Sequence, residues 1–250
     1  NDTTDIAGPD WALERAVSIA KICLARALPR SREAGGYSTY TGSAGIAFMC
    51  MKMASLDNIE RDAKLLFLRM GHEYLQIDSM AELEHEKSYM KPSLLCGPAG
   101  YHFVYALFSS PSEGEISPSA LNSVQIYLDY ASIANDIESF PDEFLYGRAG
   151  YLYGLLALEK EFGESLIPKE RIENIAHTII ESGRSYVREG RLQRRGHIPP
   201  MFWKFKSRNY LGGAHGALGI LHTLLLCPAA IWSSDESIMR DISATLDFIL

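Results

Sequence analysis

Residues 145–154 read LYGRAGYLYG, and the Gly-x-x-Gly unit inside them, from Gly147 to Gly150, recurs three more times along the chain. Each copy follows a bulky or polar pair and continues into an apolar stretch of helical length. The other copies are YTGSAGIAFMCMKMA at 40–54, LCGPAGYHFVYALF at 95–108 and AHGALGILHTLLL at 214–226. Four occurrences with the same apolar continuation indicate an internal structural repeat.

Longer amphipathic segments lie between the copies, with apolar residues at helical spacing. We expect Asp10 to cap the first of these helices, which runs to residue 28. No stretch of useful length alternates with the period of a β-strand. The further helices expected are 61–77, 119–134, 168–187 and 234–250. The sequence therefore predicts an all-α fold in which outer amphipathic helices alternate with inner apolar ones.

Such helical hairpins, repeated around an axis, form an (α/α) toroid in which the loops before the inner helices gather at one end. Glycine at the start of each inner helix lets the preceding loop turn sharply and lets backbones approach closely. We expect the residues just before the first glycines to surround a common cavity. They are Thr41, Cys96, Tyr146 and His215. Four helix pairs cover only part of such a ring, because toroids of this kind need six or seven, so the prediction is an incomplete toroid forming one domain over 1–250.

Composition places the chain among ordinary globular proteins, with 47% hydrophobic and 22% charged residues. The net charge of −7 argues against nucleic acid as a main partner. The four cysteines contain no CxxC pair, which fits reduced thiols and a cytoplasmic location. No secretory signal is recognisable, and the apolar run 216–232 is predicted to be one buried helix. The start at Asn1 and the end inside a helical pattern at Leu250 suggest a fragment.

The repeat segments resemble the eukaryotic LanC-like proteins, relatives of the bacterial lanthionine synthetase C cyclases. The most specific matches are DEFLYGRAGY at 142–151 and YLGGAHG at 210–216, and the likeness extends from about residue 10 to 250. The resemblance implies a seven-pair (α/α) toroid with a catalytic zinc. The family's zinc ligands lie in Trp-Cys-His-Gly-like and Cys-His-Gly motifs, and neither motif occurs here. We therefore expect zinc in a full-length member but assign no metal ligand to this chain.

The activity that the resemblance implies is addition of the glutathione thiol to dehydroalanine or dehydrobutyrine residues in peptides or proteins. His215 matches a motif histidine outside the zinc ligands, and an imidazole suits proton delivery to the enolate at neutral pH. Glu143 matches an acidic position of the family and is the second catalytic candidate. Asp142 competes with it, and both carboxylates have an alternative role as helix N-terminal charges.

Two more residues are candidates for substrate binding. Arg148 is a candidate for binding the carboxylates of glutathione or a phosphorylated substrate, and a structural salt bridge is its alternative role. Tyr146 occupies the position before the glycine and is expected to line the cavity. The basic residues of the loop before the fourth copy form a solvated surface, with an interaction with a phosphopeptide or an anionic membrane as the second interpretation. They are Arg191, Arg194, Arg195, Lys204, Lys206 and Arg208.

Two other functions remain open from the sequence. The first is a glutathione-binding signalling or scaffold protein of the same fold without turnover. The second, an (α/α)-toroid glycosidase, needs two opposed carboxylates, and Glu143 has no second carboxylate at a repeat junction. The expected partners are thus glutathione and a dehydroamino-acid polypeptide, with peripheral association with the plasma membrane as a further expectation.

Overall fold

The computed structural model describes residues 9–26, 36–76, 90–110, 115–192, 196–232 and 235–250, and side chains from residue 11 onward. Throughout this part of the chain the regular structure is helical, with one isolated antiparallel bridge between Phe205 and Arg208. The predicted all-α class is thus confirmed. The contacts divide the chain into two compact units, 1–79 and 80–250, and each is described by itself.

The first unit contains α1 (Pro9–Arg26), α2 (Ser43–Ala54) and α3 (Arg61–Leu75). Helix α2 is the expected inner helix of the first repeat and packs against the amphipathic α3. Their interface buries small residues of α2 against Phe67 and Tyr74 of α3. The expected N-cap at Asp10 is wrong, because α1 already begins at Pro9. A proline suits the first helical position, since its fixed φ is helical and its missing N–H would have no helical partner.

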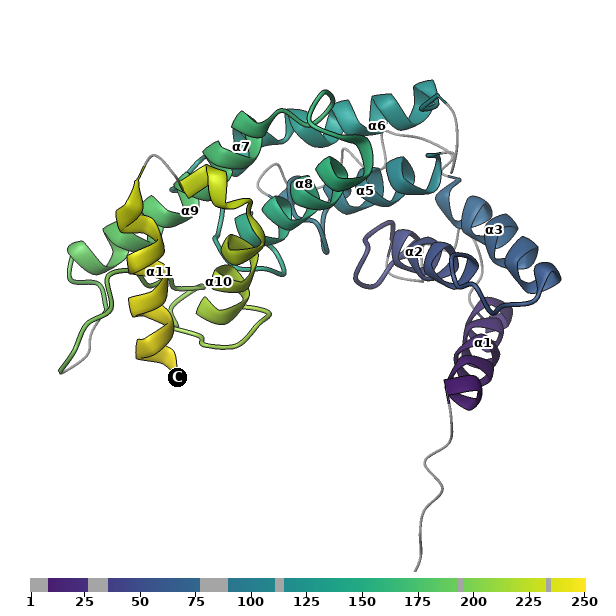
Figure 1. Ribbon diagram of the computed structural model, residues 1–250, viewed down its shortest axis with the longest axis horizontal. Coiled ribbons are helices and arrows are strands. Elements are labelled where there is room, and N and C mark those ends of the chain that lie inside the picture. Colours follow the sequence, from purple (N-terminus) through teal and green to yellow (C-terminus); the bar gives the residue numbers. More distant parts are fainter. Residues whose placement is uncertain (1–8, 27–35, 77–89, 111–114, 193–195, 233–234) are drawn as a thin grey trace, which may run out of the picture. The chain divides into compact units, whose positions relative to one another are not determined.

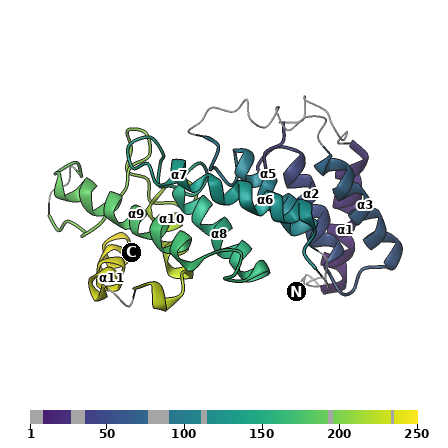
Figure 2. The ribbon, with the colours of Figure 1, turned by 90° about the horizontal axis from the view of Figure 1, so that it is seen from above.

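In the second unit the inner helices are α5 (Pro98–Phe108), α8 (Arg148–Phe162) and α10 (Ala217–Leu226). The outer ones are α6 (Pro118–Asp129) with the short α7 (Ala131–Ala134), then α9 (Lys169–Arg188) and α11 (Glu236–Ile249). Each inner helix packs against the outer helix that follows it, and α8 packs between α5 and α10. Figures 1 and 2 show this succession of helix pairs along the unit.

Two helices differ in extent from the prediction. The segment expected as one helix over 119–134 divides at Tyr130 into α6 and α7. The apolar run 216–232 is not one buried helix, because α10 ends at Leu226 and a 3-10 turn, η3 (Ala229–Trp232), follows. Pro228 explains this end, since a proline ring prevents the helix from continuing. The predicted ends at residues 27–28, 77 and 234 lie outside the described residues.

The glycine pairs are explained by a backbone contact that the repeats share. The first N–H groups of α8 and α10 donate to loop carbonyls seven residues earlier, as Arg148 does to Pro141 at 2.8 Å and Ala217 to Tyr210 at 3.0 Å. The loop thereby supplies acceptors for N–H groups that have none within the helix. A Cβ on Gly147 or Gly150 would collide with the carbonyl oxygens of Pro141 or Phe144. The predicted close backbone approach is confirmed.

Helix α8 is joined to α6 by two tyrosines that exchange hydrogen bonds. The Tyr127 hydroxyl donates to the Tyr151 carbonyl at 2.8 Å, and the Tyr151 hydroxyl donates to the Tyr127 carbonyl at 2.7 Å. Their rings stack with centroids 4.8 Å apart, and Gly154 provides the space, since a Cβ there would overlap the Tyr127 hydroxyl. This reciprocal pair fixes the distance between an inner and an outer helix.

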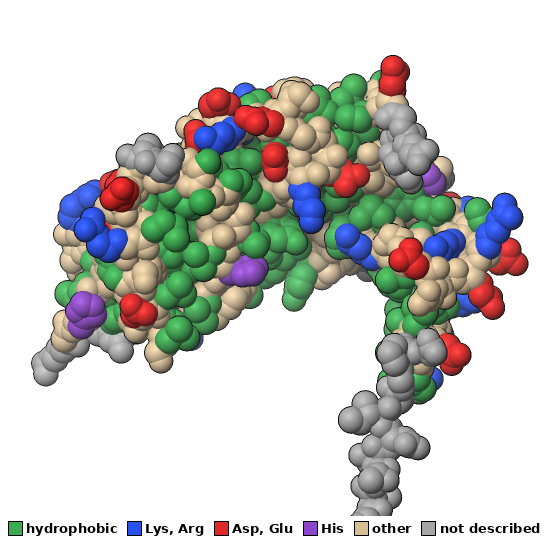
Figure 3. All heavy atoms as spheres, in the orientation of Figure 1, with side chains coloured by type: hydrophobic (Ala, Val, Ile, Leu, Met, Phe, Trp, Pro, Cys, Tyr) green, Lys and Arg blue, Asp and Glu red, His purple; other side chains and the backbone are tan. Residues whose placement is uncertain are grey.

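Part of the second unit exposes apolar side chains. Leu225 and Leu226 at the end of α10 are about half exposed, at 48% and 47%, and Met239 of α11 is 43% exposed. Figure 3 shows green side chains spread over the side of the unit that carries α10 and α11. Exposure of inner-helix surface is what an incomplete ring of helix pairs predicts.

Candidate functional site

The loops that precede the three inner helices of the second unit are hydrogen-bonded to one another. The Ser93 hydroxyl donates to the Leu145 carbonyl at 3.1 Å, and the Leu145 N–H donates to the Ala214 carbonyl at 3.1 Å. Ser93 also accepts the N–H of Cys96. These contacts bring the residues before Gly97, Gly147 and Gly216 together, as the repeat predicts for this unit. Thr41 belongs to the other unit, where its N–H donates to the Ser38 hydroxyl.

Glu143 and His215 form the polar centre of these loops. Glu143 Oε2 lies 2.6 Å from His215 Nδ1, and the Glu143 side chain is only 2% exposed, whereas that of His215 is 33% exposed. Both carboxylate oxygens also accept backbone N–H groups, from Leu145 and Tyr146. Burial raises the pKa of Glu143, and the hydrogen bonds from His215 and the two amides counteract part of that rise.

This arrangement fixes the imidazole by its Nδ1 edge. The two amide donors orient Glu143 as an acceptor, so that His215 Nδ1 carries the shared proton. The other ring nitrogen, Nε2, is then the one that can exchange a proton with a bound molecule. An anionic partner on Nδ1 stabilises the protonated ring, which is the form that acts as a general acid.

Two aromatic rings, those of Phe205 and Tyr146, lie nearly parallel to the imidazole of His215. Phe205 stacks on His215 with centroids 4.8 Å apart and an interplanar angle of 4°. The Tyr146 ring lies 5.8 Å from each of these two rings, so that the three form an offset group rather than a linear stack. Tyr210 approaches His215 at 5.9 Å with a tilt of 50°. Offset aromatic packing of this kind restricts the imidazole to one plane.

Cys96 lies beside this group, in agreement with the expectation that it lines the same space. It makes a hydrogen bond with the Tyr146 side chain and is close enough to Glu143 for that carboxylate to affect its titration. Burial raises the pKa of the Cys96 thiol to about 11, and the nearby Glu143 charge adds to the rise. The thiol therefore stays protonated at neutral pH, which is unsuited to a nucleophile or a metal ligand.

Asp142 and Arg148 form a separate, buried pair. Arg148 is fully buried, and its NH1 lies 2.7 Å from Asp142 Oδ1. Its Nε donates to the Ala134 carbonyl at 2.7 Å and its NH2 to the Asp136 carbonyl. Ser182 of α9 donates to the other Asp142 oxygen at 2.6 Å. Every nitrogen of the guanidinium is thus engaged by protein atoms.

The expectation that Arg148 binds substrate is therefore not supported by its position. Its side chain ties α8 to the α7 region, so the geometry favours the structural alternative, with Asp142 as the salt-bridge partner. The same geometry separates the two neighbouring carboxylates, because Asp142 contacts Arg148 while Glu143 contacts His215. Of the four predicted site residues, His215, Glu143 and Tyr146 come together and Arg148 does not join them.

Two aromatic residues of the site, Phe205 and Tyr210, were not among the predicted site residues. They lie in the loop that runs into the fourth glycine copy, and only their closeness in sequence to His215 could have indicated them. Phe205 takes part in the isolated bridge with Arg208, a short hairpin that places its ring on the imidazole. The sequence shows that aromatic residues occur in this loop, but it does not show the hairpin turn that directs the Phe205 ring.

The described residues do not offer a metal site. They contain no group of three or more His, Cys, Asp or Glu side chains arranged to hold an ion. Burial also raises the pKa of Cys50 and Cys227 to about 12, which opposes thiolate ligation. The donor set of the described residues therefore does not fit the zinc that the family resemblance implies.

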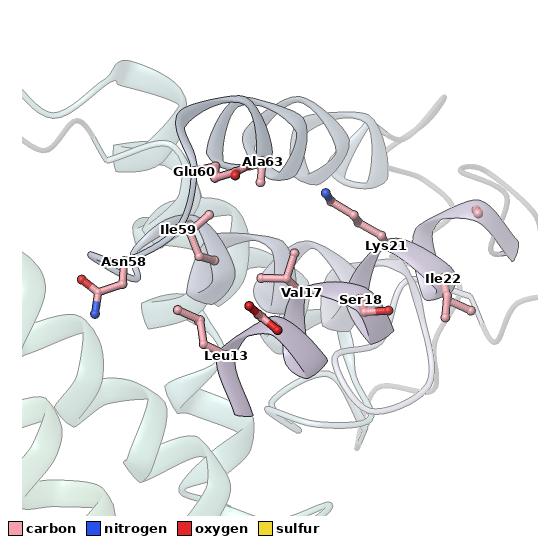
Figure 4. A pocket seen from close by; sticks show the side chains of 11 residues that line it. Leu13, Val17, Ser18, Lys21, Ile22, Asn58, Ile59, Glu60 and Ala63 are labelled. Carbon is pink, nitrogen blue, oxygen red and sulfur yellow. The ribbon is translucent and has the colours of Figure 1, made fainter. Parts of the chain in front are cut away.

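His215 does not line either of two further cavities. One, of about 770 Å³, is in the first unit between α1 and the start of α3. Figure 4 shows Leu13 and Val17 of α1 facing Ile59, with Lys21 and Glu60 at the edge. The other, of about 600 Å³, is in the second unit and is lined by polar and charged residues of α9 and the two loops beside it. No described helix has the length and apolarity required to cross a membrane.

Comparison with known proteins agrees with this arrangement of repeats. Residues 33–250 match the family described as lanthionine synthetase C-like protein. A curated relative from Danio rerio, named glutathione S-transferase LANCL1, is 28% identical over 187 residues, which cover 74% of this chain and 42% of the relative. The chain thus spans less than half the length of that relative. Since the family match covers most of its residues, the chain belongs to the lanthionine synthetase C-like family.

Proposed function

We propose that the protein catalyses the addition of glutathione to dehydroalanine or dehydrobutyrine residues of polypeptides, with His215 as the general acid. The observation that carries the proposal is the hydrogen bond between Glu143 and His215 at the junction of three repeats. The name of the 28% identical relative, a glutathione S-transferase, supports glutathione as the thiol.

The chemistry needs one proton at a defined place. The glutathione sulfur bonds to the β-carbon of the dehydroamino acid, and the electron pair of the carbon–carbon double bond moves to form an enolate. Protonated His215 then gives the Nε2 proton to the α-carbon of that enolate. The proton that the glutathione thiol loses returns His215 to its protonated form. Glu143 acts as a positioning residue, because it fixes the imidazole plane and stabilises its charge.

We further propose that the zinc of the family is held by residues other than those described. The steps above use only described residues, and none of them depends on a metal. A cytoplasmic location is supported by the cysteines, which are all free, with Cys50 and Cys227 buried. These parts of the proposal rest on the resemblance and on composition, and they are separable from the role of His215.

The test is turnover of a dehydroalanine peptide with glutathione by the full-length protein, followed by mass spectrometry of the adduct. We expect His215→Asn to lower kcat on the order of 10²-fold, the usual contribution of a general acid. His222→Gln, which changes an exposed histidine of α10 seven residues after His215, is the matched control and should leave kcat unchanged. An unaltered rate in His215→Asn would refute the proton role. Glutathione binding without any adduct would favour the scaffold function.

A further inference from the structure

The cavity of about 600 Å³ in the second unit lies next to the His215 group, by which we mean His215 with Glu143, Phe205 and Tyr146. The cavity and this group lie on opposite sides of the same loops. Its volume is within the range of about 300–1,000 Å³ that is typical of ligand sites. Phe140 and Trp203 form an apolar part of its wall, and Ser182 and Tyr186 of α9 form a polar part. Lys204 and Lys206 line it from the loop before α10.

Two chain segments separate the cavity from the catalytic candidates. In the first segment, Asp142 lines the cavity while the next residue, Glu143, contacts His215. In the second, Lys204 and Lys206 line the cavity while Phe205 between them stacks on His215. In the second segment, Lys206 lies in the tight turn after Phe205, with a φ of +55°. The cavity and the His215 group therefore share their wall.

The charges of the cavity favour an anion. Asp142 pairs with Arg148, and Glu189 pairs with Arg191, which leaves Glu138 as the one lining carboxylate without an ion pair within the described residues. Lys204 and Lys206 are exposed, and neither forms an ion pair within the part of the chain that the structure describes. Lys206 lies over the Phe205 ring at 5.4 Å, so that its ammonium is held near the shared wall. The unpaired charged groups of the lining are thus Lys204, Lys206 and Glu138, which gives an excess of one positive charge in a chain of net charge −7.

We propose that this cavity binds an acidic side chain, carboxylate or phosphate, of the polypeptide whose modified residue reaches His215. The proposal rests on the proposed function, which requires a polypeptide substrate with residues on either side of the acceptor. Lys204 and Lys206 pair with the anion, while the Phe140 and Trp203 surfaces receive an adjacent apolar side chain. The cavity then selects substrates with an acidic residue near the acceptor.

The test is a binding measurement that needs neither glutathione nor turnover. Three fluorescein-labelled peptides of one sequence, carrying phosphoserine, glutamate or serine at one position, are titrated with the full-length protein and followed by anisotropy. We expect the phosphoserine and glutamate peptides to bind more tightly than the serine peptide. The order of these two peptides distinguishes a phosphate site from a carboxylate site.

Variants of the two lysines test whether the peptides bind in this cavity. Lys204→Ala and Lys206→Asn should each weaken the acidic peptides roughly fivefold, and the double variant on the order of 25-fold, with less effect on the serine peptide. Asparagine is chosen because residue 206 has a φ of +55°, which asparagine tolerates. Lys160→Ala is the control, an exposed lysine at the other end of α8, about 18 Å along the helix from Arg148.

Several results would overturn the proposal. They are equal binding of all three peptides, an equal loss with Lys160→Ala, and lysine-dependent binding of phosphatidylserine vesicles without binding of the peptides. Thermal melting of each variant checks that folding is intact. His215→Asn should bind the peptides like the wild type, so that loss of turnover there and loss of peptide binding in the lysine variants are separate failures.

Discussion

The carboxylate of Glu143 meets Nδ1 of His215 at 2.6 Å across 72 residues of sequence, and the two come from successive copies of one glycine motif. Glu143 lies four residues before Gly147, whereas His215 lies directly before Gly216, so the pair joins different positions of the loops that two neighbouring copies place side by side. A buried carboxylate held by two backbone amides is a fixed support, whereas the half-buried imidazole can meet a substrate. The difference in burial therefore assigns the supporting role to Glu143 and the contact with substrate to His215.

Glu143→Gln tests this support in the full-length protein. The amide keeps the size of the side chain but removes the negative charge that stabilises the imidazolium. We expect kcat to fall on the order of 10-fold to 10²-fold, because the imidazole loses the carboxylate that orients it. In a double-mutant cycle with His215→Asn the two losses should be far from additive, because one acts through the other. Additive losses would contradict the positioning role.

Arg148→Lys tests whether this arginine is structural. Lysine keeps the charge, but its single nitrogen cannot replace three nitrogens that contact Asp142 and two carbonyls. We expect the free energy of unfolding to fall by about 3 kcal/mol in urea denaturation, with KM for glutathione unchanged in the folded fraction. Arg240→Lys, on the exposed side of α11, should have little effect on either quantity. A raised KM with unchanged stability would restore a binding role.

The sequence predicts the helices well because their signals are local. Helical spacing of apolar residues and the glycine pairs are properties of short segments, and they locate α2, α5, α8 and the start of α10 to within a residue or two. The meeting of Cys96, Tyr146 and His215 also follows, because equivalent positions of stacked repeats become neighbours.

The loop side chains are harder to predict, for a physical reason. Asp142 and Glu143 are adjacent in an irregular segment, where no period fixes which one points toward His215. Arg148 begins α8, so the rotation of that helix decides whether it faces the site or α7. Phe205 depends on a hairpin that only the folded chain forms. The directions of these side chains are set by tertiary contacts between residues that are far apart in the sequence, so a short sequence segment does not predict them.

Gly150→Ala tests the close approach that explains the repeat. A Cβ at this position would overlap the Phe144 carbonyl oxygen, which is backbone and cannot rotate away. We expect a loss of about 3 kcal/mol in the free energy of unfolding, the upper part of the usual range for overpacking. Gly213→Ala is the control, since nothing lies within 4 Å of its added Cβ. Equal stability of the two variants would show that the glycines serve another purpose.

His102 gives the unit a sensitivity to acid that is independent of the site. It lies in α5 at 2% exposure, its Nδ1 has no hydrogen-bond partner in the described part of the chain, and the rings of Tyr101 and Tyr130 pack nearby. Burial lowers the pKa of His102 from 6.5 to about 4. Between these values the unfolded chain binds a proton that the folded chain does not, so stability falls as the pH decreases from 6.5 to about 4.

His102→Phe removes this titration and replaces an unpartnered polar group with an apolar ring. We expect the wild type to lose up to about 3 kcal/mol more than the variant between pH 7 and pH 4, measured by urea denaturation at several pH values. At pH 7, where the histidine is neutral in both states, the two proteins should differ little. His222→Gln removes an exposed histidine and should leave the pH dependence as it is. A wild-type curve that parallels that of His102→Phe would mean that His102 gains a partner on protonation.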